Sequence, residues 1–278
     1  MKPFIVMQTD FEKSIATNTM DGVIVSIDPE LRTFDCNHMI QTFNTYEASF
    51  SLLYVVDFWP AGTVFVSVVD PGVGTDRRAC VAKLKNGSYV VTPDNGTLTH
   101  LKKYVGIEAV RVIDETKNRL VSTRKVSIFH GRDLFAYCAA KLASGIIDFE
   151  GVGPEYPVEE IVEHKMLEVT AKDGVVSGML ESASRHFGLI CSNIPCETFE
   201  KEGIVHGDLL ETVVRNKGKE VYHKTIPFQP SFGFVEEGED LVMISETQTM
   251  QIAKNLGNLC DECNFGTGPD WSITFRKV

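Results

Sequence analysis

Residues 63–78 read TVFVSVVDPGVGTDRR and join an apolar run to a loop rich in glycine and charge. The run 63–69 is β-branched and apolar at nearly every position, which is typical of a strand buried on both faces of a parallel sheet. The strand pattern ends at Asp70, and the proline and two glycines that follow predict a tight turn. Ligands of open α/β sheets bind outside the carboxyl ends of the strands. The stretch therefore predicts both a parallel sheet and a loop at its functional edge.

Strand and helix patterns alternate on both sides of this stretch. Further strands are predicted at 4–7, 33–36, 78–84, 89–92 and 109–113, and helices at 15–27, 46–58, 98–105 and 133–143. Asn86 and Gly87 predict a hairpin turn between the strands on either side of them. The alternation predicts a layered α/β domain with a mainly parallel sheet over residues 1–163.

The pattern changes after Pro154 and Pro157 to short strands separated by turn residues. Strands are predicted at 167–170, 175–180, 209–215, 220–225, 241–244 and 272–275, and a single helix at 250–256. Asn216, Lys217 and Gly218 predict a hairpin turn. We therefore expect a smaller, mainly β, barrel-like domain over residues 164–278. A length of 278 residues also agrees with two domains, because a typical domain has about 150 residues.

Charge and hydropathy limit the classes of partner. The chain has 27 Lys and Arg residues against 38 Asp and Glu residues, a net charge of −11. This charge repels nucleic acid and anionic membranes, so we expect a small-molecule partner. Asp57 and Pro60 interrupt the longest apolar stretch, and the amino-terminal residues do not have the apolar segment of a signal peptide. We expect a cytoplasmic protein.

Seven cysteines are an odd number, which favours reduced thiols over a disulfide framework. Cys260 and Cys263 form a C-x-x-C pair, and Cys191 and Cys196 are two further candidate ligands for a structural zinc ion. The spacing between the two pairs is poor for zinc. We expect independent thiols.

Polar and titratable residues recur where strands of the first domain end. These residues are Asp10, Asp35, His38, Asp70, Asp94 and Asn95, together with His130 before a predicted helix. Any one of them can be a helix cap or a turn residue, because Asp and Asn are favoured in both roles. Their recurrence at successive strand ends favours a binding site.

Two segments carry the strongest chemical signal. Asp70 is followed by Arg77, and the two either contribute to a ligand site or pair with each other only to satisfy charge. Gly131 leaves the amides at a helix start accessible, and the positive helix end favours a neutral His130 that can accept a proton from water. A histidine buried only for packing is the other reading of His130.

Several segments together resemble the S-adenosylmethionine hydroxide adenosyltransferase family, which is related to the fluorinases and chlorinases. The matching segments, in order, are 9–11, 35–38, 70–75 with Arg77, 93–96 and 129–136. The resemblance covers most of the first domain. It continues more thinly into the second domain through 187–188, 192–194 and Ser245.

The resemblance implies a hydrolase that splits S-adenosylmethionine at the ribose C5′ carbon with water or hydroxide, giving adenosine and L-methionine. It implies no metal and no cofactor, and a homotrimer whose sites lie between the first domain of one subunit and the second domain of its neighbour. By the same resemblance, Asp70, Arg77 and His130 act on the water, and Asp10 holds the ribose diol. The further substrate-binding residues that we predict are Phe11, Asn95, Gly131, Phe187, Asn193, Phe232 and Ser245.

Three alternative functions remain from the sequence. A halogenase of the same superfamily resembles its relatives in having tyrosine where this chain has His130, which favours the hydrolase. Ser184 and Leu189 stand where the family has aspartate and asparagine, which suggests a non-catalytic sensor that binds adenosine or S-adenosylmethionine. A metal-dependent hydrolase is the third alternative, with the strand-end carboxylates and histidines as ligands, although Arg77 would repel the cation.

Overall fold

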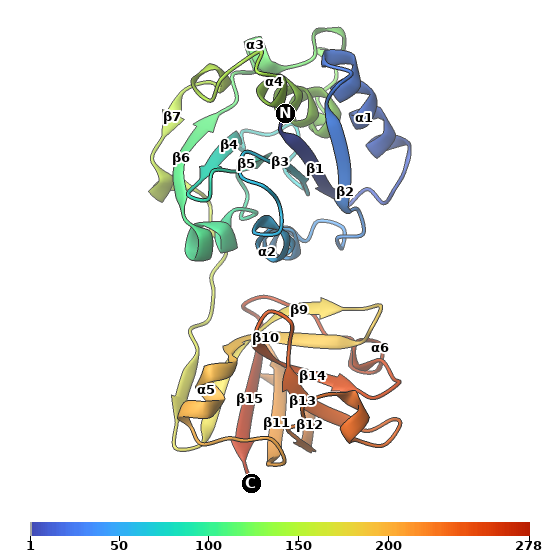
Figure 1. The fold of residues 1–278 in the computed structure, drawn as a ribbon, viewed down its shortest axis with the longest axis vertical. Helices are drawn as coiled ribbons and strands as arrows, with labels where there is room; N and C mark the ends of the chain where they lie inside the picture. The colour runs from blue at the N-terminus through green and yellow to red at the C-terminus, as the bar shows by residue number, and fades with distance from the viewer. Residues whose placement is uncertain (1) are drawn as a thin grey trace. The chain divides into compact units, whose positions relative to one another are not determined.

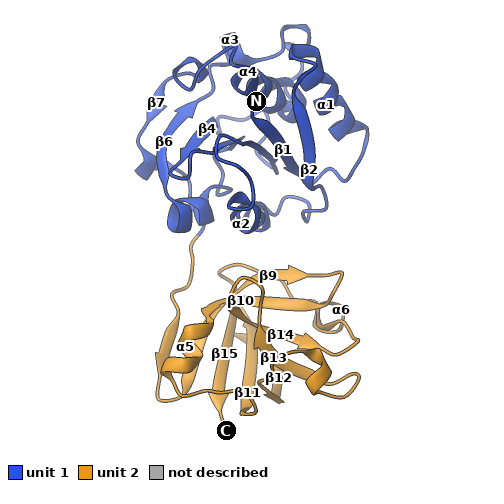
Figure 2. Cartoon of the chain, viewed as in Figure 1, with its two compact units in different colours: residues 1–164 blue, residues 165–278 orange. Residues whose placement is uncertain are grey.

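A computed structural model describes residues 2–278, which form two compact units (Figure 1). The chain divides between His164 and Lys165, as the two colours of Figure 2 show. Each unit has its own hydrophobic core.

The first unit is built on a seven-stranded sheet in the order β2-β1-β3-β5-β4-β6-β7. The strands are β1 Phe4–Thr9, β2 Arg32–Asn37, β3 Val64–Val68, β4 Ala79–Leu84, β5 Tyr89–Pro93, β6 Ile107–Val112 and β7 Glu155–Tyr156. Strands β2, β1, β3 and β5 are parallel neighbours, whereas β4 is antiparallel to both β5 and β6. Five of the seven strands therefore point the same way, and the predicted α/β class with a mainly parallel sheet is confirmed.

Helices cover both faces of this sheet. They are α1 Ile15–Ile27, α2 Thr45–Val56, η1 Leu101–Val105, α3 Glu115–Asn118, η2 Val121–Thr123, η3 Gly131–Ala136, α4 Tyr137–Ser144, η4 Glu150–Val152 and η5 Val158–Glu160. Met20 of α1 and Phe135 of η3 are buried in one core, and Leu52 of α2 and Leu101 of η1 are buried in another. The side chain of Ser14 caps α1, and Gly145 ends α4 in the left-handed conformation that glycine adopts without strain.

The second unit is an antiparallel sheet in the order β12-β11-β15-β9-β10-β14-β13, with β8 paired to β9. Its elements are β8 Thr170–Lys172, β9 Val175–Ser184, β10 Leu189–Pro195, α5 Cys196–Lys201, β11 Leu209–Asn216, β12 Lys219–Pro227, η6 Phe232–Phe234, β13 Asp240–Ile244, β14 Thr249–Lys254, α6 Leu259–Cys263 and β15 Trp271–Lys277. A bridge between Phe228, directly after β12, and Val242 of β13 brings the two ends of the sheet together, so the sheet nearly closes into a barrel. The predicted barrel-like class is confirmed.

Two predictions in this unit are wrong. Residues 250–256 are not a helix, because Thr249–Lys254 form β14, which pairs with both β10 and β13. A short apolar run fits a helix and a strand equally well, and the two neighbouring strands decide between them here. The strand predicted at 167–170 begins only at Thr170. Strand β10, Leu189–Pro195, was not predicted at all.

We expect Gly153→Ala to destabilise the protein more than Gly145→Ala. A Cβ atom at Gly153 would lie 2.2 Å from the carbonyl oxygen of Val112, whereas at Gly145 nothing lies within 4 Å. Gly145→Ala carries only the cost of a left-handed backbone, about 1–2 kcal/mol. Urea unfolding of both variants measures the difference, and equal free energies of unfolding would contradict the packing that we describe at the end of β6.

Candidate active site

The loop after β3 folds back on itself and pairs Arg77 with Asp70. The amide of Val73 donates to the Asp70 carbonyl at 3.2 Å, and the amide of Thr75 donates to the Gly72 carbonyl at 3.1 Å. These successive turns bring the Arg77 Nε atom to 2.9 Å from Asp70 Oδ1, while Arg77 NH2 donates to Oδ2. The Asp70 side chain is only 5% exposed and the Arg77 side chain 10%. The two residues form a bidentate ion pair that is largely shielded from solvent.

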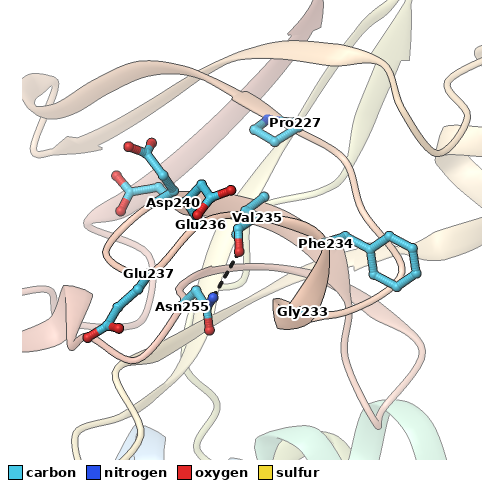
Figure 3. Close-up of a pocket in the computed structure, with 9 residues that line it drawn as sticks. Pro227, Gly233, Phe234, Val235, Glu236, Glu237, Asp240 and Asn255 are labelled. Carbon is cyan, nitrogen blue, oxygen red and sulfur yellow. Dashed lines mark hydrogen bonds between the residues drawn. The ribbon is translucent and has the colours of Figure 1, made fainter.

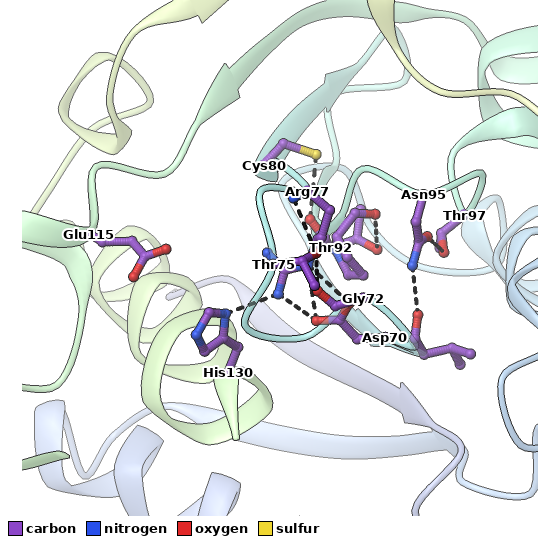
Figure 4. Close-up of polar contacts among 12 residues, drawn as sticks. Asp70, Gly72, Thr75, Arg77, Cys80, Thr92, Asn95, Thr97, Glu115 and His130 are labelled. Carbon is purple, nitrogen blue, oxygen red and sulfur yellow. Dashed lines mark hydrogen bonds and ion pairs between the residues drawn. The ribbon is translucent and has the colours of Figure 1, made fainter. Parts of the chain in front are cut away.

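Arg77 also reaches His130, at the start of η3. Its NH2 atom lies 3.0 Å from His130 Nδ1. A dashed line joins the two side chains in Figure 4. A guanidinium group can only donate, so Nδ1 is the acceptor and a neutral ring carries its proton on Nε2. The Nε2 atom is buried and has no hydrogen-bond partner among the described residues. The site therefore presents one unused donor.

Burial and the charge of Arg77 lower the pKa of His130 below its ordinary value of 6.5. Burial is the larger cause, because it disfavours the charged imidazolium. His130 is consequently neutral near pH 7. Asp70 and Arg77 lie on one loop and His130 lies on a second segment far along the chain, and the structure places Arg77 in direct contact with both of the others.

The other predicted site residues of this unit surround the same strand ends. Asp10 follows β1 and accepts a hydrogen bond from the amide of Phe43 at 2.9 Å. The ring of Phe11 packs edge-to-face on Phe129, with centroids 5.8 Å apart. A Cβ atom at Gly131 would lie 3.2 Å from both of these rings, so a larger residue at the start of η3 would require the rings to shift.

Asn95 supports the strand that leads to Asp70. Its Nδ2 atom donates to the carbonyl of Val69 at 2.9 Å, and its Oδ1 atom accepts from Thr97. Both groups of the Asn95 side-chain amide are therefore engaged inside the unit.

The predicted substrate-binding residues of the second unit differ in the hydrogen bonds that their side chains make and in their exposure to solvent. Asn193 uses both ends of its amide, accepting from the Met179 amide and donating to the Leu167 carbonyl, each at 2.8 Å. The Ser245 hydroxyl lies within a cluster with the hydroxyl groups of Thr247 and Thr249. Phe187 is 67% exposed in the turn between β9 and β10, and Phe232 is half-buried in η6.

Ser184 and Leu189 are opposite each other at the end of the β9–β10 hairpin. A serine and a leucine offer fewer hydrogen-bonding groups there than the aspartate and asparagine that the family resemblance leads one to expect.

The second unit also has a hollow of about 660 Å³ that sequence analysis missed. Figure 3 shows Phe234, Glu236, Glu237 and Asp240 around it, and Glu239 also lines it. Asp240 is neutralised by Lys224 and Lys254. None of the predicted site residues lines this hollow.

Other strand-end residues have partners that explain them without a ligand. Asp94 accepts hydrogen bonds from Arg78 and the Tyr156 hydroxyl, both at 3.0 Å, and from the Val162 amide at 2.8 Å. His38 bridges Thr9 and Asp35. Within residues 2–278, no three His, Cys, Asp or Glu side chains are arranged so that they could hold a metal ion. All seven cysteines are free thiols.

Comparison with known proteins gives matches over most of the chain. The model of the SAM hydroxide adenosyltransferase N-terminal domain matches residues 5–153, and the model of the C-terminal domain of that family matches residues 186–272. The chain is 32% identical to an (R)-S-adenosyl-L-methionine hydrolase of Methanocaldococcus jannaschii, over 60% of each chain. It is 31% identical to the hydrolase of Salinispora tropica over 98% of each.

A fluorinase of Actinopolyspora mzabensis is 25% identical over 98% of this chain and 97% of its own. Among solved structures, an uncharacterized conserved protein from Thermotoga maritima superposes with a TM-score of 0.86. That protein is 32% identical, and the alignment covers 98% of this chain and all of the other. None of the helices in the described part of the chain is long and apolar enough to cross a membrane.

We expect Asp70→Asn to lower the free energy of unfolding by about 3–5 kcal/mol, because it leaves Arg77 buried without its counter-charge. Asp10→Asn is the matched control. Its carboxylate has no ion pair among those found in the described residues and accepts one backbone hydrogen bond, so a loss of about 1 kcal/mol or less is expected. Urea titration monitored by tryptophan fluorescence measures both, and equal losses would contradict a buried ion pair at Asp70.

Proposed function

Because the chain belongs to the S-adenosylmethionine hydroxide adenosyltransferase family, we propose that it hydrolyses S-adenosylmethionine at the ribose C5′ carbon to adenosine and L-methionine. The observation that carries the proposal is the contact of Asp70, Arg77 and His130 at the carboxyl ends of the strands. Relatives named as hydrolases over nearly the whole chain support the same assignment.

The proposed reaction requires activation of the nucleophile and not of the leaving group. The water oxygen forms a bond to C5′, and the electron pair of the C5′–S bond goes to sulfur. The sulfonium becomes a neutral thioether, so no acid has to protonate it, and the attacking water loses one proton to bulk water. No metal or cofactor is required by this scheme.

His130 acts in the proposed reaction as a donor. With Nδ1 occupied by Arg77, the Nε2–H group donates to the attacking oxygen and stabilises its developing hydroxide character. Arg77 contributes positive charge beside that oxygen, and Asp70 fixes the direction in which the guanidinium points. This geometry supports polarisation of water by His130 over direct removal of its proton, since a proton already occupies Nε2.

The remaining assignments belong to the same proposal. Asp10 holds the ribose diol, and the other substrate contacts are made by Phe11, Asn95, Gly131, Phe187, Asn193, Phe232 and Ser245. We infer a homotrimer in which the second unit of a neighbouring subunit completes each site, and a cytoplasmic location.

Incubation of the purified protein with S-adenosylmethionine should release adenosine and methionine in equal amounts. We expect His130→Ala to lower the rate about 10²–10⁴-fold, because it removes the donor to the nucleophile. His223→Ala is the matched control, since that histidine is exposed on β12 and pairs with Glu211 and Glu220.

Adenosine release no faster than that of His130→Ala would exclude the hydrolase. Tight binding of adenosine by calorimetry without turnover would then favour the sensor. Formation of a 5′-halogenated nucleoside in chloride or fluoride would favour a halogenase.

The rate should fall on the acid side with an apparent pKa below 6.5. The pKa of His130 is lowered in the folded protein by burial and by Arg77. The neutral ring is the active form in our proposal, because a proton on Nδ1 would end the contact with Arg77 that orients the imidazole. Activity is therefore expected to be retained at pH 7 and to be lost only as the pH falls through that lowered value. A profile of kcat against pH measures this, and an acid limb above pH 7 would contradict it.

A further inference from the structure

A chain of hydrogen bonds connects the ends of β1 and β2 beside Asp10. His38 is in the middle of this chain, and its side chain is only 4% exposed. The Nδ1 atom of His38 lies 2.9 Å from Thr9 Oγ1, and its Nε2 atom lies 3.1 Å from Asp35 Oδ1. Asp35 also pairs with Lys13, which is at the surface. The reaction proposed above uses none of these partners of His38.

The direction of each hydrogen bond follows from the chemistry of the groups. The hydrogen bond from Lys13 holds the pKa of Asp35 below its ordinary value, so the carboxylate is ionised at neutral pH and only accepts. The His38 Nε2 atom therefore carries a proton, and in the neutral ring Nδ1 accepts from the Thr9 hydroxyl. The Thr9 oxygen in turn accepts from the amide of Phe11 at 3.1 Å. The chain of bonds thus runs from Asp35 to the backbone at Phe11.

These bonds enclose Asp10. The bond between the Phe11 amide and the Thr9 hydroxyl closes a turn in which Asp10 is the central residue. The next amide, that of Glu12, donates to the carbonyl of His38 at 2.9 Å. Glu12 has a φ of +56°, a left-handed conformation that is uncommon for residues other than glycine. His38 therefore holds the segment that carries Asp10 through both its side chain and its main chain.

The pairing of β2 with β1 is irregular at the same place. Met7 pairs with Asp35. The next residue, Gln8, pairs with Asn37, so β2 contains one extra residue there. Such irregularities redirect the neighbouring side chains and are frequent beside active sites. The extra residue lies between Asp35 and His38, in the segment that brings the imidazole to the end of β1.

The Asp10 carboxylate has one oxygen left for a ligand. Its Oδ2 atom accepts from the amide of Phe43 at 2.9 Å, and its Oδ1 atom has no hydrogen-bond partner among the described residues. Phe43 also has a left-handed backbone, with a φ of +66°. Unfavourable backbone conformations on both sides of one side chain persist only where the surrounding contacts hold them. The contacts made by Thr9 and His38 are of this kind.

We propose that Thr9 and His38 are positioning residues that fix the Asp10 carboxylate in the direction needed to bind the two adjacent hydroxyls of a ribose, and that Asp35 orients the imidazole for this purpose. The inference rests on the proposed function for the role of Asp10 at the ribose diol. It extends that function to selectivity. A carboxylate that is fixed in advance loses less freedom on binding, so the intact chain of bonds should favour nucleosides that have both hydroxyls.

The test is the selectivity of the full chain for the diol, measured by calorimetry as the dissociation constant for 2′,3′-dideoxyadenosine divided by that for adenosine. Thr9→Val keeps the shape of the side chain and removes its hydroxyl, so we expect it to lower this ratio about tenfold. Thr9→Ser retains a hydroxyl and should keep the ratio of the wild type.

Thr63→Val is the matched control. Thr63 is also buried, and its hydroxyl donates to the carbonyl of Pro60 at 2.7 Å. It directly precedes β3 and so lies at the opposite end of the sheet from Thr9. The selectivity of Thr63→Val should equal that of the wild type.

An unchanged ratio in Thr9→Val would overturn the proposal, and so would an equal loss of affinity for both nucleosides, which is the result of a merely structural defect. A wild type that binds adenosine no more tightly than the dideoxynucleoside would overturn it as well. Should Thr9→Val not fold, His38→Phe decides in its place, because it keeps a ring and removes both nitrogens, and the same loss of selectivity is expected.

The proposed function and this inference fail in different ways. Selectivity for the diol that depends on Thr9, without release of adenosine from S-adenosylmethionine, would reject the hydrolysis and support the inference. Release of adenosine by a wild type whose selectivity Thr9→Val leaves unchanged would support the hydrolysis and reject the inference.

Discussion

The first unit depends on one arginine that donates in two directions at once. Arg77 has no acceptor atom, so its contacts with the Asp70 carboxylate and with His130 Nδ1 can be read in only one way. That constraint fixes the tautomer of the neutral imidazole and leaves Nε2–H as the unused donor. It also explains the loop sequence, because the turns from Asp70 to Thr75 are what return the chain to Asp70 within seven residues.

The same edge of the sheet carries both structural and candidate functional residues, and the sequence did not separate them. Asp94 and Asp70 each follow a strand and each pair with an arginine. The two sites differ in whether every buried polar group has a hydrogen-bond partner. Arg78, Tyr156 and the amide of Val162 all donate hydrogen bonds to Asp94. These bonds fix the segment that leads out of the first unit. Next to Arg77, by contrast, His130 keeps a buried donor that has no partner in the described part of the chain. A buried unpaired polar group is costly, so one that is retained calls for an explanation such as a ligand.

The architecture of the first unit could be predicted because parallel strands buried on both faces have continuous apolar sequences, and the helices between them have clear ends such as Ser14 and Gly145. The second unit was harder to predict, because the strands of an antiparallel barrel are short and contain both polar and apolar residues. Strand β10 carries Ser192 and Asn193 on a segment whose polar side chains bond inside the unit, so its sequence gave no strand signal. The family resemblance pointed to Asp70, Arg77 and His130.

The charges of Asp70, Arg77 and His130 bear on which nucleophile this cluster of three residues can activate. Asp70 offsets the charge of Arg77, and His130 is neutral because burial and Arg77 lower its pKa. The three groups together therefore have almost no net charge. Such a cluster gains little by capturing an anion from solvent, as a halogenase must do, and it does not repel a cationic sulfonium. It does supply oriented donors that stabilise negative charge on the water oxygen as its proton is lost, which is where fixed dipoles in a buried site contribute most. The balance of charges thus favours a neutral nucleophile and a cationic substrate.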